Sequence, residues 1–304
     1  MSSSPPSVAV DALPRDTGGG RLTAETPLAA ATGVRRLSRN RTAVGGGAVV
    51  LLIGLAAILA PAIAPYQYNA QDFTQPLSPP SWSHLLGTDE QGRDVLSRVI
   101  YGGRISLPIG LIAVSIAAVS GLLLGAVAGY FGSWADAAIM RLMDVLLAFP
   151  TILLALAIIA ILGPGIVNVM IAVGISSVPL YTRVVRGSVL TVKNTDYVMA
   201  AQAVGGSAVR IVARHVLPNS FAPVMVLATT GTAAAIITSA ALSFIGLGAQ
   251  PPLPEWGSML NTGREYLRHA PWMTTFPGLA IVVTVVAINL LGDGLRDVLD
   301  PRLR

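Results

Sequence analysis

The chain has 304 residues, of which 53% are hydrophobic and 12% are charged, and it contains no cysteine. Soluble domains carry about 25% charged residues, so this composition argues against a soluble protein, and the lack of cysteine excludes disulfide frameworks, thiolate zinc sites and cysteine nucleophiles. The formal net charge of +5 does not indicate nucleic-acid binding, because the arginines flank apolar segments, where membrane topology accounts for them.

Residues 1–34 are rich in Ser, Pro, Gly, Ala and Thr without helical or strand periodicity, which predicts a disordered cytoplasmic tail. Basic residues and an apolar run from Ala43 to Pro65 follow. Together with the small residues at 62–64, this order is also typical of a secretory signal peptide. We favour a retained first transmembrane helix within an N-terminal region of residues 35–83, because about 40 residues precede the apolar run and Pro65 would follow the cleavage site.

Long uncharged stretches indicate the membrane spans. No Asp, Glu, Lys or Arg occurs in residues 43–71, 105–135, 145–182, 215–254 or 269–292. A helix needs about 20 apolar residues to cross the hydrocarbon core, and Gly163, Pro164 and Gly165 form a turn signal that divides the third stretch. The sequence therefore predicts an all-α integral membrane protein with six transmembrane helices, at residues 43–65, 105–130, 144–163, 166–182, 220–246 and 273–293.

The orientation of the spans follows from the excess of Lys and Arg in cytoplasmic loops. With the N-terminus in the cytoplasm, 13 of these residues lie inside and 5 outside, leaving aside Arg15 and Arg21 in the distal tail. Both termini are then cytoplasmic. The inside residues are Arg35, Arg36, Arg39, Arg41, Arg141, Arg183, Arg186, Lys193, Arg210, Arg214, Arg296, Arg302 and Arg304, and the outside residues are Arg93, Arg98, Arg104, Arg264 and Arg268.

A glycine stripe marks the second expected span. Gly121, Gly125 and Gly129 recur every four positions and so share one helix face. Small residues at this spacing allow helices to approach closely in lipid. The face packs either against another helix of this chain or against a partner subunit.

The outer segment 66–104 carries charges of alternating sign. Asp94 and Arg98 are four residues apart, so on a helix they would pair on one face. This pattern predicts a solvated amphipathic helix at the membrane surface. The alternative is an outer gate, or a dock for a solute-binding protein, formed by Asp89, Arg93, Asp94 and Arg98.

The cytoplasmic loop 195–219 begins with a short-helix pattern. Asp196 or the preceding threonine can cap a helix, and residues 197–204 are good helix formers. Gly205 and Gly206 then end this helix, and we expect Gly205 to have a positive φ.

A second short helix is expected in the same loop. Ser207 can cap it, and Arg210 and Arg214 would share one of its faces. Pro218 suits the first turn of the next span, because its missing N–H has no partner there in any case. The loop is either a connector or a docking site for a partner.

This loop resembles the EAA loop of bacterial ABC importer permeases, through Ala200, Ala201, Gly205 and the run from His215 to Pro218. In that family the loop forms a coupling helix that seats in a groove of the ATPase subunit. Met199 departs from the family's glutamate, and His215 departs from its usual aliphatic residue. The resemblance implies an ATPase-coupling role for Asp196, Tyr197, Ala200, Ala201, Gly205, Leu217 and Pro218.

Three further segments resemble dipeptide and oligopeptide permeases of the smaller C type. They are HLLGTDEQGRDVLSRVIYGGRISL from His84, ALSFIGLGAQPPLPEWGSML from Ala241 and GDGLRDVLDPRLR from Gly292. The resemblance covers residues 84–304 and implies the type I fold of an ABC importer permease there, in the bacterial cytoplasmic (inner) membrane.

The resemblance also implies partners and a solute. The expected partners are a homologous second permease subunit, one or two ABC ATPase subunits and an extracytoplasmic solute-binding protein. The expected solute is a dipeptide or oligopeptide, and nickel or another small solute is the alternative.

Energy must come from a separate subunit, because the chain has no GxxxxGK[ST] phosphate loop for ATP. We expect a non-catalytic subunit without a cofactor or metal, since His84, His215 and His269 lie in different loops on both sides of the membrane. A secondary carrier is the main rival class. It would show internal repeats and midplane charges, whereas Asp144 and Asp293 lie at expected span ends, where gating or capping is the expected role.

Overall fold

The computed structural model describes residues 40–299, so the expected tail at 1–34 lies outside the described residues, as do Arg35, Arg36, Arg39, Arg302 and Arg304. Regular structure in the described part is helical, apart from one isolated bridge between Thr88 and Asp94. The helices are α2 (Arg41–Ile58), α3 (Ala60–Ile63), α4 (Val95–Phe131), α5 (Ser133–Leu147), α6 (Thr151–Leu162), α7 (Ile166–Lys193), α8 (Asp196–Ala203), α9 (Ala208–Ile211), a π-helical turn (Val212–Val216), α10 (Leu217–Phe244), α11 (Trp256–Gly263), a 3₁₀ turn (Arg264–Tyr266) and α12 (Trp272–Leu299).

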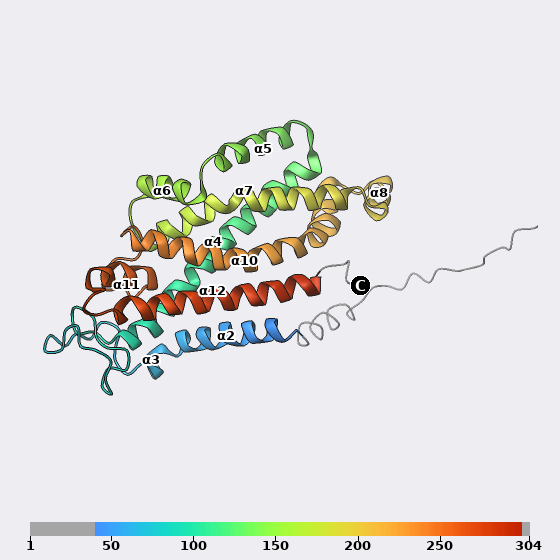
Figure 1. Cartoon of the computed structure of the whole chain (residues 1–304). Helices are drawn as coiled ribbons and strands as arrows, with labels where there is room; N and C mark the ends of the chain where they lie inside the picture. The colour runs from blue at the N-terminus through green and yellow to red at the C-terminus, as the bar shows by residue number, and fades with distance from the viewer. Residues whose placement is uncertain (1–39, 300–304) are drawn as a thin grey trace, which may run out of the picture.

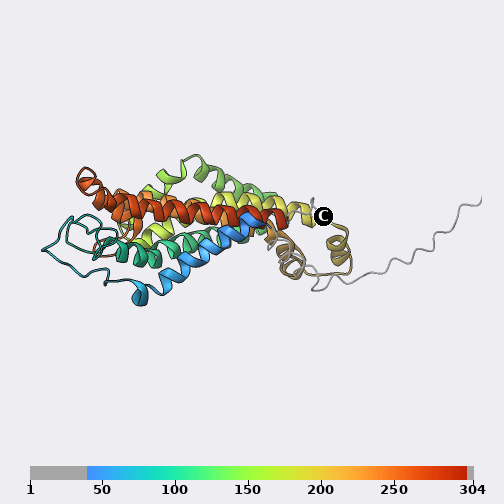
Figure 2. The ribbon, with the colours of Figure 1, turned by 60° about the horizontal axis from the view of Figure 1, so that its bottom comes forward.

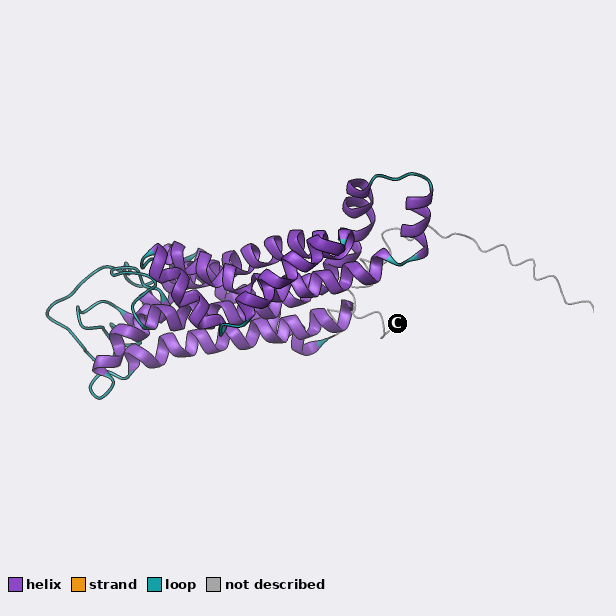
Figure 3. Cartoon of the chain, turned by 90° about the horizontal axis from the view of Figure 1, so that it is seen from above, coloured by secondary structure: helices purple, strands orange, loops and turns teal. Residues whose placement is uncertain are grey.

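The long helices lie side by side in one elongated bundle (Figure 1). Within residues 40–299, five helices are long and apolar enough to cross a membrane, with α9, the π-helical turn and α10 counted as one. The bent pair of α5 and α6 supplies a sixth span when taken together. The loop before α4 gathers with α11 at one end, and α8 projects from the other end (Figures 2 and 3). The predicted all-α membrane bundle is confirmed.

The third expected span, at 144–163, is wrong as a single helix. α5 ends at Leu147, α6 begins at Thr151, and the two helices are bent by 93°. Pro150 accounts for the break, because its ring disfavours helical backbone at the preceding residue and it has no N–H to donate.

The fourth expected span also ends too early, because α7 continues beyond residue 182 to Lys193. Arg183 Nη2 donates to Asp144 Oδ1 at 2.5 Å, and Arg186 donates to both carboxylate oxygens of Asp136 at 2.5 and 2.6 Å. These pairs tie α5 to the interior of α7. Arg183 and Arg186 therefore lie within α7 and not at its end, and Asp144 lies in the last turn of α5.

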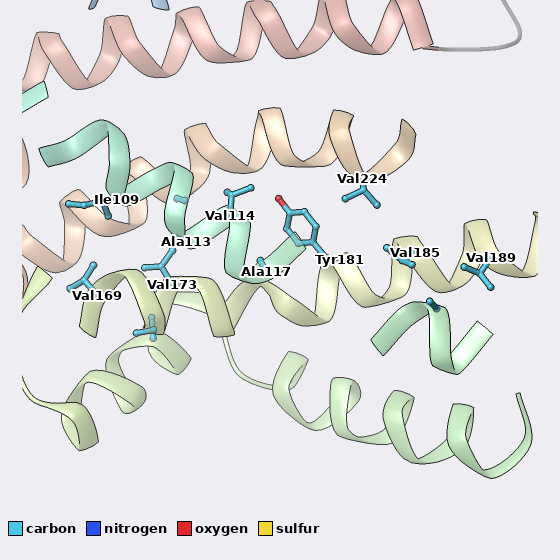
Figure 4. Packing of buried hydrophobic residues seen from close by; sticks show 14 of the residues in the cluster. Ile109, Ala113, Val114, Ala117, Val169, Val173, Tyr181, Val185, Val189 and Val224 are labelled. Carbon is cyan, nitrogen blue, oxygen red and sulfur yellow. The ribbon is translucent and has the colours of Figure 1, made fainter. Parts of the chain in front are cut away.

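The main apolar core lies where α4 packs on α7, with Tyr181 reaching towards Val114 and Ala117 (Figure 4). The glycine stripe of α4 is buried in this contact. A Cβ placed on Gly125 would lie 2.7 Å from the carbonyl oxygen of Thr182, and one on Gly129 would lie 2.8 Å from Val189 Cγ1. The stripe therefore faces α7 of the same chain, and the alternative of a partner subunit on this face is wrong.

We predict that Gly125→Ala destabilises the bundle, because the added methyl group has no room against the α7 backbone. Overpacking of this kind costs ~1–3 kcal/mol. Gly187→Ala on α7 is the matched control, since its Cβ would meet nothing within 4 Å. Thermal unfolding of the purified proteins in detergent should show a lower midpoint for the first variant alone. Equal midpoints would show that the α4–α7 contact is looser than described.

Candidate functional sites at the two ends of the bundle

The segment before α4 is built from turns. Gly87 and Gly92 have φ angles of 77° and 70°, in the region that glycine adopts cheaply. A Cβ on Gly92 would overlap the carbonyl oxygen of Asp72. The β-bridge between Thr88 and Asp94 closes this loop directly before α4. The predicted surface helix is therefore wrong for the residues that precede α4.

Charged side chains of this segment are buried. Asp89, Arg93, Asp94 and Arg98 are each at most 6% exposed. Arg93 Nε donates to Asp89 Oδ2 at 2.6 Å, Arg93 Nη2 donates to Glu90 Oε1 at 2.7 Å, and Arg98 Nε lies 3.4 Å from Asp89 Oδ2. Buried charges are tolerated when they are paired and hydrogen-bonded, which these contacts achieve. The prediction of solvated charges is wrong, and we call Asp89, Glu90, Arg93 and Arg98 the outer charge cluster.

Asp94 does not pair with Arg98, contrary to the prediction. Its Oδ2 accepts hydrogen bonds from the backbone N and the Oγ of Ser97, both at 2.7 Å, and its Oδ1 lies 3.0 Å from His84 Nδ1. Asp94 is the N-cap of α4, so its side chain turns back onto the free N–H groups of the first turn. The sequence analysis did not predict His84 as the partner of Asp94. Both residues lie in the segment from His84 that resembles the peptide permeases.

Two loops at the end of the bundle opposite α8 are joined through Arg98 and Trp256. Arg98 Nη1 donates to the carbonyl oxygens of Tyr68 at 3.0 Å and Pro252 at 3.4 Å, and Trp256 Nε1 donates to the carbonyl oxygen of Val99 at 2.9 Å. The loop before α4 and the loop between α10 and α11 therefore form one unit, which we call the outer cap.

Glu255 is a buried residue of the outer cap that sequence reasoning missed. Its side chain caps α11 by accepting from Gly257 N at 2.9 Å and Ser258 N at 2.8 Å, and Ser106 Oγ of α4 lies 3.4 Å away. Burial raises the pKa of this carboxyl group, and the backbone hydrogen bonds oppose the rise. Its position as the first charged residue after the 40-residue uncharged run 215–254 was the signal that could have pointed to it.

Glu90 lies beside a polar cavity of about 90 Å³, which Arg93, Gln250 and Asn261 also line. Within the described part of the chain, its Oε2 is buried without a hydrogen-bond partner. Burial, and to a smaller extent the nearby Asp89, raises the pKa of Glu90. Among residues 40–299, no group of three or more His, Asp or Glu side chains is placed to hold a metal ion.

At the other end, α8 ends at a glycine turn as predicted. Gly205 has φ +82°, which confirms the expected positive angle. Its N–H donates to the carbonyl oxygen of Gln202, and the N–H of Gly206 donates to that of Ala201, both at 3.0 Å. Val198 is fully buried and belongs to the same apolar cluster as the α4–α7 core. One side of α8 is therefore fixed to the bundle.

The other side of α8 and the turn after it are apolar and exposed. The exposed fractions are 86% for Val204, 75% for Val209, 50% for Met199 and 46% for Tyr197. Large apolar side chains gathered on an exposed surface indicate an interaction site. Of the residues expected to couple to an ATPase, Ala201 and Leu217 are half-buried, and the exposed ones are Asp196, Tyr197, Ala200, Gly205 and Pro218.

The second short helix differs from the expectation, because α9 continues through the π-helical turn into α10. The N–H of Leu217 donates to the carbonyl oxygen of Val212, five residues earlier. Pro218 accounts for this wide turn. It has no N–H to donate to the carbonyl oxygen of Arg214, and in a regular α-helix its ring would clash with the carbonyl group of Arg214. Pro218 lies in the first turn of α10, as predicted, although α10 continues directly from the π-helical turn.

Comparison with known proteins decides the family. A model of the binding-protein-dependent transport system inner membrane component matches residues 121–304, and one of the N-terminal TM domain of oligopeptide transport permease C matches residues 31–80. The chain belongs to this permease family. The di/tripeptide transport system permease protein DppC of Pseudomonas aeruginosa is 50% identical over 273 residues, covering 88% of this chain and 90% of that protein. The glutathione transport system permease protein GsiD of Pectobacterium atrosepticum is 47% identical over 271 residues, covering 89% and 90%.

The fold agrees with this family. An inward-facing structure of the MetNI methionine ABC transporter contains a chain with a TM-score of 0.55 and 20% identity, covering 66% of this chain and 96% of that chain. The type I permease fold expected from the sequence is thus confirmed, and the protein is a multi-pass membrane permease.

We predict a pH-dependent stability that arises from Glu90. Its pKa is raised in the folded state from the usual 4.5, so its contribution to stability is complete below pH 4.5 and is lost as pH rises through the raised pKa. Glu90→Gln should reduce the fall in thermal midpoint between pH 4.5 and 7, measured in detergent. The exposed Glu265→Gln is the control and should retain the wild-type slope. A wild-type slope in Glu90→Gln would contradict the assignment.

Proposed function

We propose that this chain is a permease subunit of an ATP-binding-cassette importer, forming half of the translocation path for dipeptides or oligopeptides. The observation that carries the proposal is the exposed apolar surface of α8 and the Gly205 turn, fixed to the bundle by Val198. The family supports it, as do the di/tripeptide and glutathione permeases among the relatives. Uptake of nickel or another small solute, in place of peptides, is the alternative outcome.

The proposed orientation places α8 and both termini in the cytoplasm and the outer cap outside. α2 begins and α12 ends at the end of the bundle that carries α8 (Figure 1). With this orientation, 13 Lys and Arg residues lie inside and 5 outside, as the positive-inside rule requires. The membrane is the bacterial cytoplasmic (inner) membrane.

The proposed mechanism transmits motion from a separate ATPase through α8. Val198 of α8 shares a buried cluster with Val185 and Val189 of α7, so a displacement of α8 moves the helix against which α4 packs. ATP is bound and hydrolysed by one or two partner ATPase subunits, and this chain is non-catalytic. A homologous second permease supplies the other half of the path.

We assign the outer cap to contact with the solute-binding protein rather than to gating. Asp89, Arg93 and Arg98 are buried and satisfied within the chain, so they hold the cap together and are not free to contact a protein. Trp82 and Phe73 are 97% and 72% exposed on the same cap. These aromatic side chains are the proposed contacts for the extracytoplasmic solute-binding protein, since aromatic residues are enriched at interfaces.

Cysteine labelling tests the orientation, because the chain contains no cysteine of its own. A membrane-impermeant maleimide applied to intact cells or spheroplasts should label Trp82→Cys and leave Val204→Cys unlabelled. Both side chains are exposed, so permeabilised cells should label both. Labelling of Val204→Cys from outside would overturn the proposed topology.

Two substitutions test the coupling surface. We expect Val204→Asp to weaken retention of the ATPase roughly thirtyfold, since an interface anchor contributes ~2 kcal/mol. Gly205→Val should also weaken it, because a β-branched residue is disfavoured at φ +82°. A Cβ on Gly205 meets nothing within 4 Å, so the bundle itself should assemble. The measurements are membrane abundance, co-purification of the ATPase and peptide uptake.

Matched controls lie at the opposite end of the bundle. Gly163 has φ +86° with nothing within 4 Å, so Gly163→Val introduces the same strain outside the coupling surface. Phe73→Asp places the same charge on an exposed apolar position of the outer cap. Both controls should retain the ATPase. Normal ATPase binding and uptake in Val204→Asp and Gly205→Val would remove the coupling role. Uptake that follows the proton gradient without the ATPase would favour a secondary carrier.

A further inference from the structure

A large groove opens at the end of the bundle that carries α8. It has a volume of about 580 Å³ and lies between α7, the first turns of α10 and the last turns of α12. Towards the middle of the bundle it closes where α12 meets α10, because a Cβ on Gly292 would lie 3.2 Å from the methyl groups of Thr229 and Thr230. With the proposed orientation, the groove opens to the cytoplasm.

The lining of this groove is not that of a lipid-facing surface. Asn219 and Thr230 contribute polar groups from α10, and Asp293 and Arg296 contribute opposite charges from α12. Charged side chains near the end of a membrane helix face water or partners, because exposure to lipid is costly. Aliphatic residues such as Leu227 form the rest of the wall. A volume of this order lies within the range of ~300–1,000 Å³ that is typical of small-molecule sites.

The spacing of the two charged side chains matches the spacing of the two charged termini of a short peptide. Asp293 and Arg296 are three residues apart on α12, so they lie on the same side of the helix with Cβ atoms ~5–6 Å apart. An extended dipeptide spans at most ~7 Å. Arginine binds carboxylates through two parallel hydrogen bonds, and the aspartate carboxylate suits an ammonium group.

We propose that this groove is an exit-side binding site for short peptides with free termini, in which Arg296 binds the peptide carboxylate and Asp293 binds its ammonium group. The groove holds the peptide after it has left the central path and before its release into the cytoplasm. The proposal rests on the proposed function as a peptide importer, and it adds a solute-contacting site to that function.

Peptide binding to the assembled, nucleotide-free complex without its solute-binding protein tests the site directly. The probes are dialanine, N-acetyl-dialanine and dialanine amide. We expect wild type to prefer dialanine over both blocked forms roughly tenfold, as for loss of a charged hydrogen-bond partner. Asp293→Asn should abolish the discrimination against the acetylated form, and Arg296→Gln should abolish that against the amide.

The neighbouring Asp297→Asn is the matched control. Asp297 also lies on α12, but its carboxylate accepts a hydrogen bond from Asn40 at the start of α2, at 3.3 Å, and it does not line the groove. It should leave both preferences unchanged. Membrane abundance shows whether each variant has assembled. Wild-type discrimination in Asp293→Asn and Arg296→Gln, or equal binding of free and blocked peptides by wild type, would overturn the site.

A labelling experiment separates the site from a subunit interface. Ala222→Cys, on the groove wall, should react with a water-soluble maleimide in the assembled complex and be protected by dialanine. A cysteine that is unreactive without peptide would mean that the second permease fills the groove, and the proposal would fail. Dialanine uptake by cells tests the importer itself, so intact uptake with failed binding or protection rejects the groove alone.

Discussion

The close approach of α4 to α7 is the contact on which the rest of the molecule depends. In lipid the hydrophobic effect does not drive helices together, so packing must come from backbones that approach closely. The glycine stripe of α4 provides this approach along three successive turns. Because the outer charge cluster lies directly before α4 and in its first turn, and the end of α7 leads into α8, this helix pair connects the two candidate sites.

The two ends of the bundle solve different physical problems. At the end opposite α8, Asp89, Arg93 and Arg98 are withdrawn from water and paired with one another and with backbone groups, which makes the cap a fixed unit. At the α8 end, apolar side chains remain in contact with water, although Val198 beneath them is buried. A surface of that kind indicates an interaction site, whereas the buried charges of the outer cap are paired within the chain.

The sequence patterns succeeded where local backbone rules govern the structure. The break after α8 could be predicted because two glycines follow good helix formers, and Gly205 adopts the expected positive φ. The same kind of reasoning failed for Asp94 and Arg98, which are spaced as on a helix. Their positions are decided by turns at Gly87 and Gly92 and by a helix that begins one residue after Asp94. It also missed the π-helical turn that joins α9 to α10, although Pro218 lies in the first turn of α10 as predicted.

By itself, the sequence determined the fold class, the apolar segments that form five to six spans, and the family, because apolar length and ordered motifs are local properties that survive without coordinates. Only the tertiary structure decided which charges are buried, that Arg98 and Trp256 join two loops about 150 residues apart, and that the glycine stripe faces α7. It also brought Asp293 and Arg296 to the mouth of a groove shared with α7 and α10. Such contacts depend on how distant helices are placed beside one another, and residue spacing within one segment carries no information about that placement.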